Sequence, residues 1–114
     1  MGSITDLRLG RDSNRWVSDE LHNQSGYIAA MVFSGAAVKS STPPATARVV
    51  KVVSSATVYV KVGGTAAVPS ADVTDGTASE CCVAGIPKFF TLDGATSVGV
   101  AAGAAAVVTL TYYS

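Results

Sequence analysis

The side chains best suited to chemistry in this chain are one histidine, two adjacent cysteines and a short acidic loop. His22 is the only histidine, and a Ser-His-Asp system needs three groups held within hydrogen-bond reach by a rigid frame. His22 lies in a polar segment too short to fold alone, which supplies no such frame. We therefore expect no catalytic residues, and the sequence does not indicate an enzyme.

Cys81 and Cys82 are neighbours in a segment with strand character. Adjacent residues of a strand point to opposite faces, so one thiol should be buried and the other exposed or at an interface. Metal sites usually space their cysteines by two or more residues, and no further cysteine or nearby histidine completes a set. We interpret the pair as small apolar residues of a core strand; a disulfide between subunits is the alternative, which a reducing compartment disfavours.

Asp72 and Asp75 lie in one loop with Gly76, and Glu80 follows closely. Calcium takes about six to eight oxygen ligands, and the loop lacks the spaced carboxylates of an EF-hand. A solvated turn is the better interpretation. We expect neither a metal nor another cofactor.

Composition favours assembly over an isolated monomer. The 114 residues are 48% hydrophobic and only 14% charged, against about 25% charged in typical soluble domains. Some apolar strand surface is therefore expected to meet another subunit.

Charge and hydropathy argue against several other roles. The net charge is zero with no basic run, so nucleic-acid binding lacks its electrostatic signature. The apolar stretch 98–108 is too short to span a membrane. Since the start of the chain has no apolar core of signal-peptide length, we expect synthesis in the cytoplasm.

The sequence divides into two chemically different parts. Residues 1–26 hold seven of the sixteen charged residues, whereas residues 27–114 are runs of Ala, Val, Thr, Gly and Ser. We predict an extended N-terminal arm (1–26) and one all-β body (27–114), a small β-sandwich or jelly roll of about seven strands. The expected strands are 27–38, 46–53, 57–62, 77–83, 88–92, 97–101 and 105–113.

Two strand pairings are also predicted. Strands 46–53 and 57–62 should form a hairpin around Ser54-Ser55-Ala56, and strands 97–101 and 105–113 should pair through a turn near Gly103. Within 57–62, Val58, Val60 and Val62 share one face, the alternation of a half-buried strand.

Two groups of residues are candidates for binding partners. Trp16 has no local core to join, so we expect it to anchor the arm on a neighbouring surface, together with Arg8, Arg11 and Arg15. Aromatic residues in the predicted strands are candidates for an oligomer interface, because alternation should turn about half of them outward. These candidates are Tyr59, Phe89, Tyr112 and Tyr113.

Residues 45–113 resemble small structural proteins encoded near the major capsid protein of tailed bacteriophages. The similar segments are ATARVVKVV, TVYVKVGG, AGIPKFFTLDG, SVGVAAG and the Thr-rich last strand. The resemblance implies a capsid decoration (cement) protein of jelly-roll or sandwich type. It also implies the major capsid protein as partner, self-association as a homotrimer or a homodimer, and a place on the virion. The alternative is a glycan- or receptor-binding module of a tail fibre or tailspike.

Overall fold

The computed structural model describes residues 27–114, and these residues form eight β-strands and no helix. The predicted all-β class is confirmed, with eight strands in place of about seven. The strands are β1 (Tyr27–Phe33), β2 (Ala37–Ser41), β3 (Val49–Ser54), β4 (Val58–Val62), β5 (Glu80–Cys82), β6 (Lys88–Thr91), β7 (Val98–Ala102) and β8 (Ala106–Tyr113).

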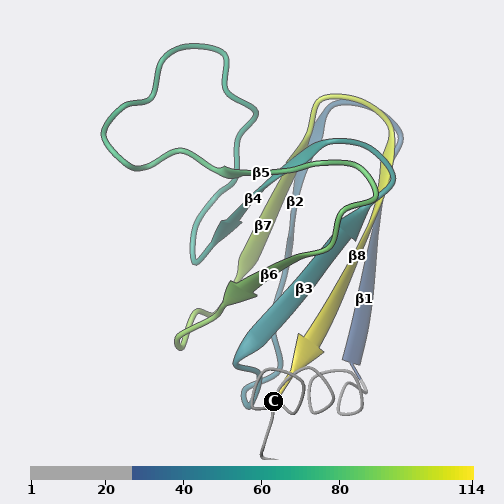
Figure 1. Ribbon diagram of the computed structural model, residues 1–114, viewed down its shortest axis with the longest axis vertical. Helices are drawn as coiled ribbons and strands as arrows, with labels where there is room; N and C mark the ends of the chain where they lie inside the picture. Colours follow the sequence, from purple (N-terminus) through teal and green to yellow (C-terminus); the bar gives the residue numbers. More distant parts are fainter. Residues whose placement is uncertain (1–26) are drawn as a thin grey trace, which may run out of the picture.

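The strands form two antiparallel four-stranded sheets that pack face to face (Figure 1). Sheet I has the order β1-β8-β3-β6, and sheet II has the order β2-β7-β4-β5. Every connection along the chain crosses from one sheet to the other, except the β4–β5 connection, which stays in sheet II. This strand order is that of an eight-stranded jelly roll.

The predicted hairpin between strands 46–53 and 57–62 is wrong. β3 pairs with β6 and β8, whereas β4 pairs with β5 and β7 in the other sheet. The Ser54 hydroxyl donates a hydrogen bond to the Ala56 carbonyl (2.5 Å) at the bend that carries the chain across. A bend into the opposite sheet buries the apolar face of each strand as well as a hairpin does, so the alternation of side chains cannot distinguish them.

Two further expectations are wrong because short turns again carry the chain from one sheet to the other. The predicted strand 27–38 is divided into β1 and β2, which lie in different sheets. The predicted pair at the end of the chain does not form: β7 belongs to sheet II and β8 to sheet I. Each short turn therefore connects the two layers, and the partners in each sheet come from distant parts of the sequence.

The core lies between the inner faces of the two sheets. Val58 and Val60 are 0% and 1% exposed, and Val62 packs against the same cluster, which confirms the predicted alternation. From sheet I, β8 contributes Val108 and Leu110, both 0% exposed. Burying such side chains stabilises the fold by roughly 1.5–3 kcal/mol each.

Lysine side chains lie at both open sides of the sandwich. On the side of β1 and β2, the Lys39 ammonium donates to the Val32 carbonyl (2.6 Å) and lies 5.3 Å from the centre of the Phe33 ring. On the side of β5 and β6, Lys88 pairs with Glu80 at 2.5 Å. The hydrogen bond from Lys88 to Glu80 raises the pKa of the lysine. Both lysines therefore link one sheet to the other at an edge.

The connection between β4 and β5 returns over the outer face of sheet II before it extends from the body (Figure 1). Gly63 donates its N–H to the Ser97 carbonyl (2.8 Å), and Ala66 is 1% exposed. A Cβ atom on Gly99 would lie 2.7 Å from the Gly64 carbonyl oxygen. Only glycine allows the two backbones to approach this closely.

Candidate interaction surface

The predicted arm contacts lie outside the described residues. Arg8, Arg11, Arg15 and Trp16, and also His22, precede Tyr27. Their proposed roles therefore stay predictions.

The four aromatic candidates for an oligomer interface divide into two pairs. Phe89 on β6 is 53% exposed, and Tyr59 on β4 is half-buried. By contrast, Tyr112 and Tyr113 are only 2% and 4% exposed, so neither offers appreciable surface to a second molecule. Of the four candidates, Phe89 presents the most surface.

Tyr112 belongs to the packing within the subunit. Its side chain lies in the core cluster, its hydroxyl donates to the Ser41 hydroxyl of β2 (2.8 Å), and its ring meets the Tyr27 ring edge-on at 5.6 Å. Burial raises the pKa of the Tyr112 hydroxyl. Since Ser41 lies in sheet II and Tyr112 in sheet I, this hydrogen bond connects the two layers.

Of the exposed large apolar side chains within residues 27–114, four lie on the outer face of sheet I, and only one of these, Phe89, was a candidate from the sequence. Ile28 and Val32 of β1 are 65% and 63% exposed, Val107 of β8 is 48% exposed, and Phe89 lies across the same face on β6. Val32 pairs with Val107, and the row Ile28, Thr111, Lys51 and Phe89 runs across all four strands. Lys51 is the one charged residue on the strands of this face within residues 27–114. A surface so poor in charge is typical of an interaction site.

The two edges of sheet I are formed by β1 and β6, and β1 is the longer strand. Among the described residues, its only strand neighbour is β8. Val107 exchanges hydrogen bonds with Ser55, so its backbone groups point away from β1. In an antiparallel ladder, the paired residue Val32 therefore points its N–H and C=O away from β8, as do Ala30 and Ile28. The 2.6 Å contact between Lys39 and the Val32 carbonyl agrees with this direction.

One feature of the sequence is relevant to strand pairing at this edge. The run Tyr27–Phe33 has seven residues without a charge or a proline, and long apolar strands of this kind pair readily when they lie at an edge. The sequence alone does not show which strand lies at an edge, and sequence analysis missed Ile28, Ala30 and Val32 for this reason.

The vicinal cysteines occupy opposite faces of β5, as predicted. Cys81 is exposed, Cys82 is 2% exposed, and both are free thiols. Burial raises the pKa of the Cys82 thiol to about 11. A protonated, buried thiol is a poor nucleophile and a poor metal ligand.

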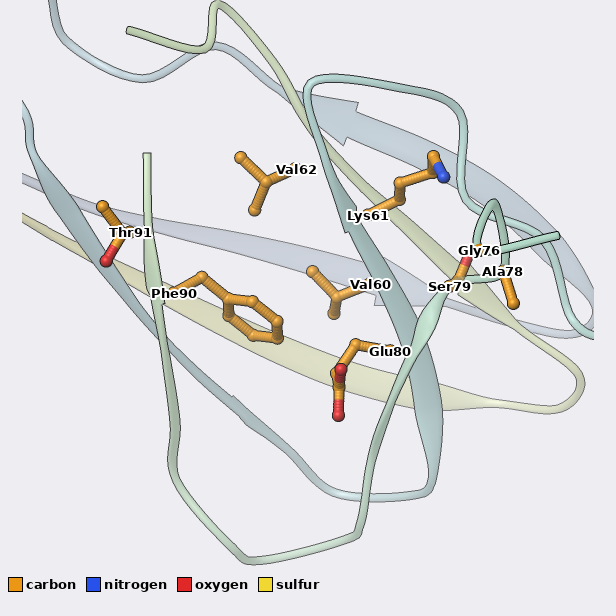
Figure 2. Close-up of a pocket in the computed structure, with 9 residues that line it drawn as sticks. All are labelled: Val60, Lys61, Val62, Gly76, Ala78, Ser79, Glu80, Phe90 and Thr91. Atoms are coloured by element: carbon orange, nitrogen blue, oxygen red, sulfur yellow. The ribbon is translucent and has the colours of Figure 1, made fainter. Parts of the chain in front are cut away.

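A cleft of about 440 Å³ opens beside β4, at the point where the short strand β5 begins at Glu80 (Figure 2). Phe90 and Val60 point into it from opposite sides, and Glu80 lies beside them. Polar groups are contributed by Ser79 and Thr91. The cleft therefore combines an aromatic ring with hydrogen-bonding groups.

The acidic loop beside this cleft is organised by its own hydrogen bonds. The Asp75 carboxylate accepts hydrogen bonds from the Thr77 N–H (3.1 Å) and the Thr77 hydroxyl (2.6 Å), and these bonds lower the pKa of Asp75. The Lys61 ammonium donates to the Thr77 carbonyl (2.7 Å). Within residues 27–114, no group of three or more metal-ligating side chains comes together.

Residues 27–114 thus form a jelly-roll domain with an exposed apolar patch on the outer face of sheet I. Over the same residues, no helix is long and apolar enough to cross a membrane. Compared with protein-family models, curated proteins and solved structures, the chain gives no significant match to any of the three.

Proposed function

We propose that this protein is a structural component of a tailed-phage virion that decorates the outside of the head and ties neighbouring major capsid subunits together. It acts without catalysis or a cofactor, and it is made in the host cytoplasm before it joins the capsid. The partners are the major capsid protein and further copies of the chain.

The observation that carries this proposal is the outer face of sheet I. Ile28, Val32, Val107 and Phe89 are all about half exposed or more, and the strands of this face carry a single charged residue, Lys51, within the described part of the chain. Leaving this much apolar surface in water is costly for a body of this size, and contact with other subunits removes the cost. The fold is consistent with the decoration proposal, because jelly rolls recur in capsid proteins, although a fold alone does not determine a function.

The arm supplies the contact with the capsid in this proposal. Trp16 provides a large apolar side chain, and Arg8, Arg11 and Arg15 provide guanidinium groups that pair with carboxylates of the capsid subunits. Many copies around one head add their weak contacts together, so no single contact needs to be strong.

Co-sedimentation with empty heads tests the proposal. The heads are assembled from the major capsid protein of a tailed phage that carries this chain, and the full-length protein should bind them saturably. Trp16→Ala should weaken binding by at least about tenfold, as expected for an interface anchor, and deletion of residues 1–26 should abolish it. The control Val83→Ala alters an exposed side chain of the body (56% exposed) and should bind normally.

The two parts of the proposal can fail separately. Heads that bind none of the full-length protein would exclude the decoration function. If the variant lacking residues 1–26 coats heads with full affinity, the arm is not the capsid contact, and the outer face of sheet I becomes the candidate.

The cleft beside β4 favours a second candidate, a glycan- or receptor-binding module. Phe90 next to Glu80, Ser79 and Thr91 is the mixture of ring face and hydrogen-bonding groups that sugars bind. A glycan array distinguishes the two functions. Binding that is lost in Phe90→Ala would support the glycan module, whereas binding to heads alone supports decoration.

A further inference from the structure

The backbone of β1 offers a complete set of hydrogen-bonding groups to another strand. Ile28 and Ala30 point their N–H and C=O away from β8, and Val32 does the same. The Val32 carbonyl already accepts from Lys39 (2.6 Å), but a carbonyl oxygen has two lone pairs and can accept a second donor. With respect to residues 27–114, the edge is therefore open along its length, apart from the lysine at one end.

The side chains of this edge are arranged symmetrically about Ala30. The same three residues present their side chains on the outer face, with Ile28 (65% exposed) and Val32 (63% exposed) two positions to either side of the small Ala30. If two β1 strands pair antiparallel with Ala30 opposite Ala30, each Ile28 lies opposite the Val32 of the other copy. Pairs of large β-branched residues stabilise adjacent strands.

Charge and shape both favour a second copy of this chain as the partner. No residue of β1 is charged, so two identical strands meet without repulsion along the ladder. A two-fold antiparallel pair uses the same edge of each molecule and closes both edges at once. An edge that is complementary to itself needs no foreign strand.

We infer that the protein forms a two-fold symmetric dimer in which the β1 edges of two copies pair antiparallel about Ala30, which joins the two copies of sheet I into one continuous eight-stranded sheet. The apolar row at Ile28, Val32 and Val107 then continues across the two-fold axis. Of the two oligomers expected from the sequence, this selects the homodimer. The inference specifies the self-association of the proposed virion protein, but it is tested in solution without capsids.

Sedimentation velocity of the full-length protein and of Ala30→Pro tests the dimer. The Ala30 N–H points away from β8, so proline removes the intermolecular donor while the ladder within the subunit is kept, and proline is tolerated at such edge positions. The wild type should sediment with twice the mass of one chain, and Ala30→Pro should raise the dimer dissociation constant by at least about tenfold. The matched control Ala30→Ser keeps the N–H and should remain dimeric.

Charge substitutions test the register and do not depend on proline being tolerated. The double variants Ile28→Lys/Val32→Lys and Ile28→Glu/Val32→Glu should each be monomeric, because like charges then face each other across the axis. An equimolar mixture of the two should form heterodimers. The control Phe89→Lys/Thr91→Lys places the same charges on the opposite edge strand, β6, and should leave the dimer intact.

Several outcomes would overturn the inference. These are a wild type that is monomeric or trimeric, a dimer that persists in folded Ala30→Pro, like-charged variants that still self-associate, a mixture that forms no heterodimers, or loss of the dimer in the β6 control. Circular dichroism of each variant establishes that it is folded. Head binding is measured separately, so a wild type that coats heads as a monomer would refute the dimer and leave the decoration proposal standing.

Discussion

The two sheets of this jelly roll share one core but differ in what covers their outer faces. On sheet II, the chain itself returns through Gly64 and Ala66 over β7, so that Gly99 is buried although it points away from the core. On sheet I, Ile28, Val32 and Val107 stay exposed. The chain therefore covers part of the outer face of sheet II, where Val38 stays 54% exposed, and leaves more large apolar side chains exposed on sheet I. This difference is why we assign the interaction surface to sheet I.

The core shared by both sheets should give the largest effect on stability. Leu110→Ala truncates a fully buried side chain of β8 and should lower the free energy of unfolding by about 2–5 kcal/mol. Val107→Ala, on the same strand but 48% exposed, should change it by less than about 0.5 kcal/mol. Urea unfolding measures both. Equal effects would mean that the outer face of β8 is packed as tightly as the inner face.

One added methyl group on β7 should displace the β4–β5 connection from the outer face of sheet II. Gly99→Ala places a Cβ 2.7 Å from the Gly64 carbonyl oxygen, so the connection must move, at a cost of about 1–3 kcal/mol. Limited proteolysis should then cut residues 63–79 faster than in the wild type. Gly103→Ala is the matched control, because its Cβ would have no neighbour within 4 Å. If both variants behave like the wild type, the connection does not hold the outer face of sheet II.

The hydrogen bond between Tyr112 and Ser41, which links the two sheets, should contribute less to stability than the core does. Tyr112→Phe keeps the buried ring but removes the hydroxyl that donates to Ser41 at 2.8 Å. We expect the free energy of unfolding to fall by about 0.5–1.5 kcal/mol, the net value of one hydrogen bond. Thermal unfolding compares this variant with Tyr59→Phe, whose half-buried ring lies on β4. A larger loss in Tyr59→Phe would contradict the assignment.

The buried thiol of β5 should make the stability of the fold depend on pH. Burial raises the pKa of Cys82 from 9.0 to about 11, so the folded protein holds this proton more tightly than the unfolded chain does. The resulting stabilisation is complete below pH 9 and is lost as the pH rises toward 11. Urea unfolding should show a smaller loss over this range for Cys82→Ala than for the wild type.

Alkylation provides an independent check on the same pair. In the native protein near pH 8, iodoacetamide should modify the exposed Cys81 and leave the buried Cys82 unmodified. Cys81→Ala should then be almost unreactive until it is unfolded. Rapid labelling of Cys82 in the folded variant would show that β5 opens readily.

The alternation of side chains was sufficient to predict most strands and several faces. Val58, Val60 and Val62 face the core as expected, and Cys81 and Cys82 divide between the surface and the core. The turn after β6 also has residue types that suit its backbone. Asp93 and Gly94 end the segment after β6 with φ angles of 50° and 80°, a left-handed turn that glycine and aspartate favour.

Strand pairing could not be predicted in the same way. Ser54-Ser55-Ala56 makes a bend in either case, and only its direction decides whether β4 lies beside β3 or across the core from it. The tyrosines of β8 illustrate a second difficulty. Alternation placed Tyr112 and Tyr113 on opposite faces, yet both are almost fully buried. Residues far away in the sequence determine such burial.

The sequence by itself determined the all-β class, the positions of most strands and the division between a polar segment and an apolar body, because these follow from local composition and from the two-residue period of a strand. The tertiary structure decided which strands pair, that β1 lies at an edge, and that Ile28, Val32, Val107 and Phe89 gather exposed on the outer face of sheet I. Those features depend on contacts between residues distant in the chain. The period of a strand defines two faces, but it does not specify what covers either of them.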